Sequence, residues 1–117
     1  MGFRKPSTDE ARLIRALVAR SAGLSLPPDW GGRLRVQEMS DGGMGSLRLS
    51  FADGDDGNRS LGEVAAELQF TDADGVEVIA SLNADGDGVP FELDVWKSDF
   101  SALVRIPDPV PLGEAGS

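Results

Sequence analysis

The chain has 117 residues and a net charge of −9, with 20 acidic and 11 basic side chains. This length is typical of a single domain and is sufficient to bury a core without disulfides or metals. The chain contains no cysteine and no histidine, which excludes disulfides, zinc–thiolate sites and a Ser-His-Asp triad.

The first predicted element is a helix over residues 8–22. Ser7 and Glu10 have the spacing of a capping box, in which each side chain bonds the backbone N–H of the other residue. Leu13, Ile14 and Leu17 then recur at the spacing of one helical face. Glycine at position 23 is a typical helix stop, and the Pro-Pro pair that follows excludes continuation of the helix.

From residue 32 onward, apolar and polar residues alternate with the period of a β-strand. Strands are predicted over residues 33–39, 46–51, 63–70, 76–82 and 89–96. The turns between them are rich in Asp and Gly, and the stretch "GGMGS" at 42–46 is expected to be a tight turn. The side chains expected to face the core include Leu47, Leu49, Phe51, Leu68, Phe70, Val78, Leu82, Phe91, Leu93 and Val95.

Short connections between these strands favour antiparallel hairpins over crossovers. The predicted fold is therefore an α+β domain over residues 1–107, in which the helix packs on a four- to five-stranded antiparallel meander sheet. A helix with a small five-stranded barrel is the alternative. Residues 108–117 are rich in Pro and Gly, and we expect them to form a flexible tail.

Charge is unevenly distributed along the chain. Residues 1–35 carry seven basic and three acidic side chains, a balance of +4, whereas residues 36–117 carry four and seventeen, a balance of −13. An acidic field repels phosphate groups, so we expect no nucleic-acid partner. No stretch approaches the ~20 apolar residues that span a bilayer, and no secretory signal is visible. We therefore expect a cytoplasmic protein with no membrane partner.

The stretch "LNADGDGVPFELD" resembles a calcium-binding loop. Asn83, Asp85 and Asp87 alternate as the first ligands of an EF-hand do, and Gly88 follows at the sixth position. Both flanks have the pattern of strands, whereas an EF-hand requires helices, so a hairpin turn is the favoured interpretation. Asp94 would lie too far along an extended strand to complete a shell. A weak calcium site at these three residues stays an alternative, and we predict no cofactor.

Aspartates also gather in two other predicted turns. If the tips of these turns meet at one end of the sheet, they would form an acidic rim that could bind a cation weakly or meet a basic partner. The residues concerned are Asp53, Asp55, Asp56, Asp72 and Asp74.

The stretch "FELDVWKSDF" is the most distinctive in the chain. Alternation places Glu92, Asp94 and Trp96 on the outer face of the sheet, and Lys97 and Asp99 follow at the end of the strand. An indole beside two carboxylates is typical of a binding surface. Coverage of the indole by a loop or by a second subunit is the alternative. Neither a pocket nor a positioned acid accompanies the carboxylates, so we do not expect an enzyme.

Two motifs carry a resemblance to a known family. "DGGMGSLRL" and "FELDVWKSDFSALVRIP" resemble an uncharacterised family of small bacterial domains, over nearly the whole chain from Arg4 to Pro107. This resemblance implies no activity for particular residues. The terminal segment is also similar to that of immunity proteins of bacterial toxin systems, which implies an inhibitor that binds a protein.

The leading interpretation is a non-enzymatic protein-binding module, with an immunity-type inhibitor as its most specific form. Its basic partner would contact Glu92, Asp94, Trp96, Lys97 and Asp99. A homo-oligomeric structural protein is one alternative, because the basic helix and acidic sheet of two copies would attract each other and exposed strand edges could pair. A homodimer is its simplest form. The weak calcium-binding protein described above is the other.

Overall fold

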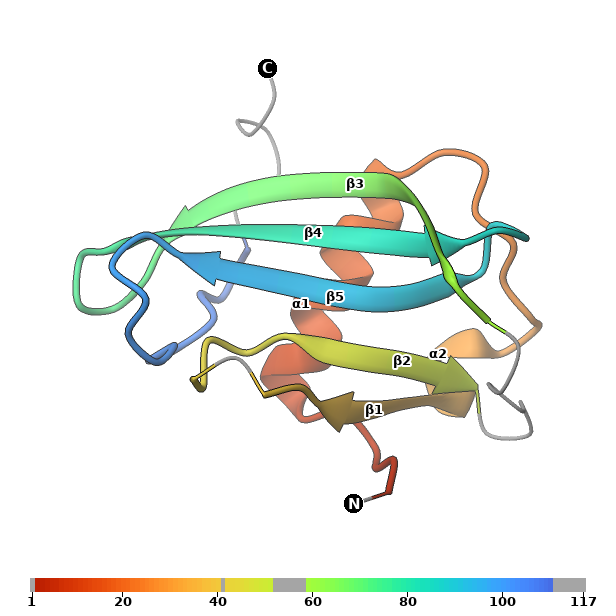
Figure 1. Cartoon of the computed structure of the whole chain (residues 1–117), viewed down its shortest axis with the longest axis horizontal. Helices are drawn as coiled ribbons and strands as arrows, with labels where there is room; N and C mark the ends of the chain where they lie inside the picture. The colour runs from red at the N-terminus through yellow and green to blue at the C-terminus, as the bar shows by residue number, and fades with distance from the viewer. Residues whose placement is uncertain (1, 41, 52–58, 111–117) are drawn as a thin grey trace.

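The computed structural model describes residues 2–40, 42–51 and 59–110 as one helix packed on one face of a sheet (Figure 1). The element order agrees with the α+β prediction. The elements are α1 (Thr8–Arg20), α2 (Trp30–Arg33), β1 (Leu34–Glu38), β2 (Leu47–Phe51), β3 (Leu61–Thr71), β4 (Glu77–Asp85) and β5 (Pro90–Lys97).

Helix α1 begins at the predicted capping box. The Glu10 N–H donates to Ser7 Oγ at 3.1 Å, and the Ser7 N–H donates to Glu10 Oε1 at 2.8 Å. The helix ends at Arg20 rather than at residue 22, because Ser21 adopts an extended conformation and caps the last turn. Leu13 and Leu17 are fully buried, as their spacing predicts. Neither helix in the described ranges has the length and apolar character needed to span a membrane.

The strands form an open antiparallel sheet in the order β1-β2-β5-β4-β3. The α+β class is therefore confirmed, and the barrel alternative is wrong because β1 and β3 are separate edges. The order also differs from a simple meander, since β2 pairs with β5 and not with β3. Burial explains this arrangement. The first four residues of β3 are exposed, as is typical of an edge strand. Buried residues recur along the whole length of β5, which occupies the centre of the sheet.

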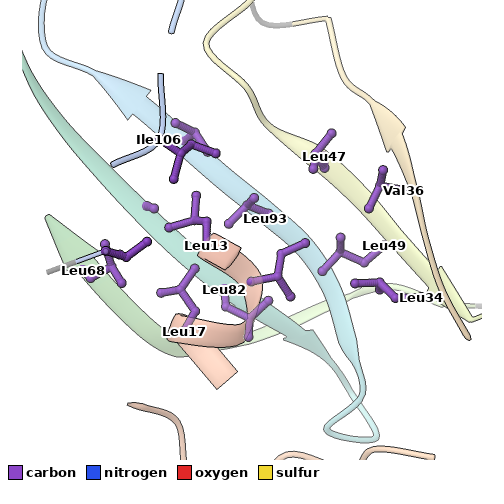
Figure 2. Close-up of a cluster of buried hydrophobic side chains, with 14 of the residues drawn as sticks. Leu13, Leu17, Leu34, Val36, Leu47, Leu49, Leu68, Leu82, Leu93 and Ile106 are labelled. Atoms are coloured by element: carbon purple, nitrogen blue, oxygen red, sulfur yellow. The ribbon is translucent and has the colours of Figure 1, made fainter. Parts of the chain in front are cut away.

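The hydrophobic core lies between α1 and the sheet (Figure 2). Leu13 and Leu17 of α1 pack with the sheet residues Leu82 and Leu93, and Ile106 joins them from the C-terminal segment (Figure 2). Val110 also belongs to this core, although it falls in the range predicted to be a flexible tail. The ordered core thus extends beyond the expected boundary at residue 107, and residues 111–117 lie outside the described ranges.

The connection between β1 and β2 is the tight turn expected from "GGMGS". Gly42, Gly43 and Gly45 all have positive φ, at 75°, 83° and 107°. Residues with a Cβ atom rarely adopt this conformation, so the turn requires glycine at these positions.

Candidate functional site

Helix α1 covers only one face of the sheet, and the other, outer face is not covered by this helix (Figure 1). Strand β5 is the central strand of the sheet. On that outer face β5 carries Glu92, Asp94 and Trp96, in the alternation expected from the sequence. Asp94 is exposed, and Trp96 is 42% exposed. Glu92 is largely buried, and its Oε2 atom lies 3.8 Å from a guanidinium nitrogen of Arg48.

An aromatic pair dominates this region. The rings of Trp96 and Phe100 meet edge to face, with centroids 6.0 Å apart and planes at 82°. Phe100 is 66% exposed and has a φ of 62°, which is the left-handed region. Holding a bulky residue there costs roughly 1–2 kcal/mol. Exposure and backbone strain both oppose stability, so the geometry of Phe100 points to a role at the surface.

Phe100 is the residue of this site that sequence reasoning missed. Its left-handed backbone has no signal in the sequence, because the residue types that favour it are Gly, Asn and Asp. The turn that presents it is shaped by Asp99, whose Oδ1 atom accepts from the Ser101 N–H at 3.0 Å and from Ser101 Oγ at 2.6 Å. These bonds from Ser101 lower the pKa of the exposed Asp99 carboxyl.

Lys97 lies inside the molecule, although the sequence groups it with the surface residues. Its side chain is fully buried because position 97 has the same inward parity as Leu93 and Val95. The ammonium group bonds Asp72 Oδ2 at 2.8 Å and Asp74 Oδ2 at 2.6 Å. It also donates to the backbone carbonyl of Ala102 at 2.9 Å, and so ties the loop after β5 to the β3–β4 turn.

The carboxylate of Asp72 is the centre of this buried cluster. It accepts bonds from the backbone N–H groups of Ala73, Val104 and Arg105, at 2.7, 2.8 and 2.9 Å. Burial disfavours the ionised form, but the bonds from Lys97 and these backbone groups outweigh it and lower the pKa of Asp72 to about 2. For Lys97, burial likewise opposes the charge, but Asp72 and Asp74 raise its pKa. Both groups are therefore ionised at neutral pH.

The expected acidic rim is not formed by the described aspartates. Asp72 is buried, and Asp74 is paired with Lys97. The turn that holds them lies at the opposite end of the sheet from Asp85 and Asp87, because successive strands run antiparallel (Figure 1). The other three members of the predicted rim, Asp53, Asp55 and Asp56, lie outside the described residues.

The two sequence motifs that carry the family resemblance meet in space. The Val95 N–H donates to Ser46 Oγ at 2.9 Å, and the Leu103 N–H donates to the Gly43 carbonyl at 3.0 Å. A side chain at Gly45 would crowd Leu103, since an added Cβ would lie 3.1 Å from its Cδ2 atom. The Gly-Met-Gly-Ser turn thus supports β5 and the loop that presents the aromatic pair.

The calcium-like stretch at the other end of the sheet forms a hairpin turn. Asn83 and Asp85 belong to strand β4, which is longer than predicted. Asp85 Oδ1 accepts from the N–H groups of Asp87 and Val89, at 2.9 and 3.0 Å, and Oδ2 accepts from Arg59 Nε at 2.9 Å. Burial opposes the charge of Asp85, but these bonds lower its pKa. The Asp85 carboxylate therefore serves the turn and the Arg59 pair.

Within the described ranges, no group of three or more His, Cys, Asp or Glu side chains is placed to hold a metal ion. The candidates Asn83, Asp85 and Asp87 lie in the hairpin that joins β4 to β5, where Asn83 and Asp85 are buried and Asp87 is exposed.

Phe91 of strand β5 is buried, as expected, but it lies outside the main hydrophobic cluster. The guanidinium carbons of Arg48 and Arg59 lie 4.5 and 4.9 Å from its ring centroid. The cause is an irregularity in the pairing of β4 with β5, which matches Asn83 with Glu92 and leaves Phe91 without an opposite residue.

Comparison with known proteins identifies a family but no relative of known function. The model of a domain of unknown function, DUF6984, matches residues 3–107. No match was found among curated proteins. None was found among solved structures either. Because the family model covers most of the chain, the protein belongs to the DUF6984 family.

Proposed function

We propose that this DUF6984 domain is a protein-binding module. Its contact region, the β5 surface, consists of Glu92, Asp94, Trp96, Asp99 and Phe100. The observation that carries the proposal is the exposed Trp96–Phe100 pair, in which Phe100 is held in a strained backbone conformation. Aromatic residues are enriched at protein interfaces, and tryptophan is frequent among the few residues that supply most of the binding energy.

Rigid support strengthens the proposal. The loop that presents Phe100 is fixed by the bond from Lys97 to the Ala102 carbonyl and by the bonds from Val104 and Arg105 to Asp72. A preorganised surface loses less conformational entropy when it binds, so more of its contact energy appears as affinity.

Charge indicates the chemistry of the partner. Asp94 and Asp99 are exposed beside the aromatic pair, and the nearest cation in the sequence, Lys97, is buried and neutralised by two aspartates. The β5 surface therefore remains negative. A partner with arginine or lysine side chains would pair with these carboxylates and stack on the indole. The immunity-type role is a narrower form of this proposal, in which the partner is a toxin that the domain inhibits.

The test is capture of a partner on the immobilised full chain, followed by affinity measurement with the purified partner. We expect Trp96→Ala and Phe100→Gly each to weaken binding by at least about tenfold, as interface anchors do. Asp94→Asn should weaken it less and reduce its dependence on salt. Phe3→Ala is the matched control, since Phe3 is an exposed aromatic residue outside the β5 surface.

Two outcomes would contradict this function. One is a partner whose affinity is the same for the wild type and for the Trp96 and Phe100 variants. The other is self-association of the wild type that these substitutions abolish, because the surface would then be covered by a second copy. Light scattering at low and high salt distinguishes the second outcome from binding to a different protein.

A further inference from the structure

A cavity of about 530 Å³ lies at the β1 edge of the molecule, between the start of α1, helix α2 and the start of β1. Lys5, Arg12, Arg15 and Arg35 line it, and the part of its lining that the structure describes contains neither Asp nor Glu. The chain as a whole has 20 acidic and 11 basic side chains. The charged residues of the described lining are therefore all basic, contrary to the composition of the protein.

Arg12 differs from the other three cations, because its charge is already compensated. Its guanidinium lies 2.9 Å from Asp9 Oδ1 and 3.6 Å from Asp108 Oδ1. It also reaches the backbone carbonyls of residues 106 and 107. Arg12 therefore forms part of the wall of the cavity and needs no further anion.

Lys5, Arg15 and Arg35 have no carboxylate partner among the residues that the structure describes. Arg15 lies over the ring of Trp30, with its guanidinium carbon 5.4 Å from the centroid. Arg35 donates to the carbonyls of Gly32 and Leu34, at 3.1 and 2.9 Å. Three positive charges without a carboxylate partner in the described ranges line one hollow and repel each other, and a bound anion would relieve this repulsion.

We infer that this cavity binds a small phosphorylated molecule through Lys5, Arg15 and Arg35. Its volume falls in the range of small-molecule sites, which is roughly 300–1,000 Å³. Guanidinium groups match the geometry of phosphate oxygens, and a lysine adds a mobile point charge. Pro6, Ala11 and Leu34 supply an apolar part of the lining for the organic part of such a ligand.

The proposed site does not require the dipole of α1. The Ser7 side chain already caps the first turn by accepting from the Glu10 N–H. It is also independent of the β5 surface, which has the opposite charge and lies two strands away in the sheet.

Trp30 offers a direct readout, because Arg15 lies over its ring. In a Trp96→Phe background, Trp30 is the sole tryptophan of the chain. We expect its fluorescence to change saturably on titration with pyrophosphate and with AMP. Calorimetry on the wild-type chain should give the same dissociation constants. A response to pyrophosphate alone would identify the ligand as an inorganic or terminal polyphosphate, and a tighter response to AMP would identify a nucleotide-like ligand.

Arg15→Gln and Arg35→Gln should each weaken binding by at least about tenfold. The matched control is Arg105→Gln, which removes an exposed arginine outside the cavity and should leave the affinity unchanged. Absence of a saturable response to both probes would overturn the inference. Equal loss of affinity in all three variants would also overturn it, since binding would then follow net charge rather than the cavity.

Discussion

Replacing Asp72 by asparagine tests whether an ionised carboxylate holds the loop behind the aromatic pair. Asp72 is buried and bonds Lys97 at 2.8 Å, together with the backbone N–H groups of residues 73, 104 and 105. Asparagine has nearly the same size, and its carbonyl oxygen can keep part of these hydrogen bonds. The substitution therefore removes mainly the negative charge that Lys97 faces.

The magnitude follows from the pKa of Asp72, which falls from an ordinary value of 3.8 to about 2 on folding. Each pKa unit corresponds to about 1.4 kcal/mol, so the ionised form adds about 2 kcal/mol to the free energy of unfolding at neutral pH. The folded-state pKa is the lower one, so this contribution is complete above the unfolded-state value of 3.8. It is lost as the pH falls through about 2.

Urea unfolding of the wild type and Asp72→Asn at several pH values measures this contribution. We expect the wild type to be more stable by about 2 kcal/mol at pH 7, and by less than about 0.5 kcal/mol near pH 2. Taking the difference between the two proteins removes the effect of other carboxylates that titrate in the same range.

Asp87→Asn is the matched control, because Asp87 is an exposed aspartate in another turn. Its stability should stay within about 0.5 kcal/mol of the wild type at every pH. A loss for Asp72→Asn that is equally large at pH 7 and pH 2 would refute the electrostatic reasoning, since it would arise from packing alone.

Three further predictions concern the backbone. Phe100→Gly should leave the free energy of unfolding unchanged or raise it by up to about 1 kcal/mol, because relief of the left-handed strain offsets the lost ring contact; a clear loss in urea unfolding would contradict this. Gly62→Ala should lower the free energy of unfolding by about 1–3 kcal/mol, since the added Cβ would lie 2.7 Å from the Asp85 carbonyl oxygen. Gly86→Ala should leave the free energy of unfolding unchanged, because the space around Gly86 is open. Ser7→Ala should lower stability by about 1 kcal/mol in thermal unfolding through loss of the helix cap, and an unchanged midpoint would show that the cap is dispensable.

Local patterns were sufficient to predict α1 and the five strands of this fold, but not the short helix α2. The capping box at Ser7 and Glu10 marked the start of α1, and period-two alternation located the five strands. Strand order could not be predicted, because alternation shows which face of a strand is buried but not which strand is its neighbour. The pairing of β2 with β5 depends on contacts far apart in sequence.

Lys97 shows how the charge of a residue can lead to a wrong placement even where the alternation of the strand predicts the right one. Its position continues the inward series of Leu93 and Val95, whereas its charge suggested the surface. The structure follows the alternation because the β3–β4 turn brings Asp72 and Asp74 to its ammonium group. Such a partner becomes apparent only when the pairing of the strands is known.

The motif on β5 contains two interleaved sets of residues with different physical roles. The inward set, Leu93, Val95 and Lys97, is buried and is accounted for by the core and the ion-pair cluster. Stability does not account for the outward set in the same way, because Trp96 is 42% exposed and the Phe100 that packs against it is held in a strained conformation. A sequence selected for folding alone would place a glycine or a polar residue at position 100. The presence of an aromatic side chain there is the strongest reason to seek the function of this domain at the β5 surface.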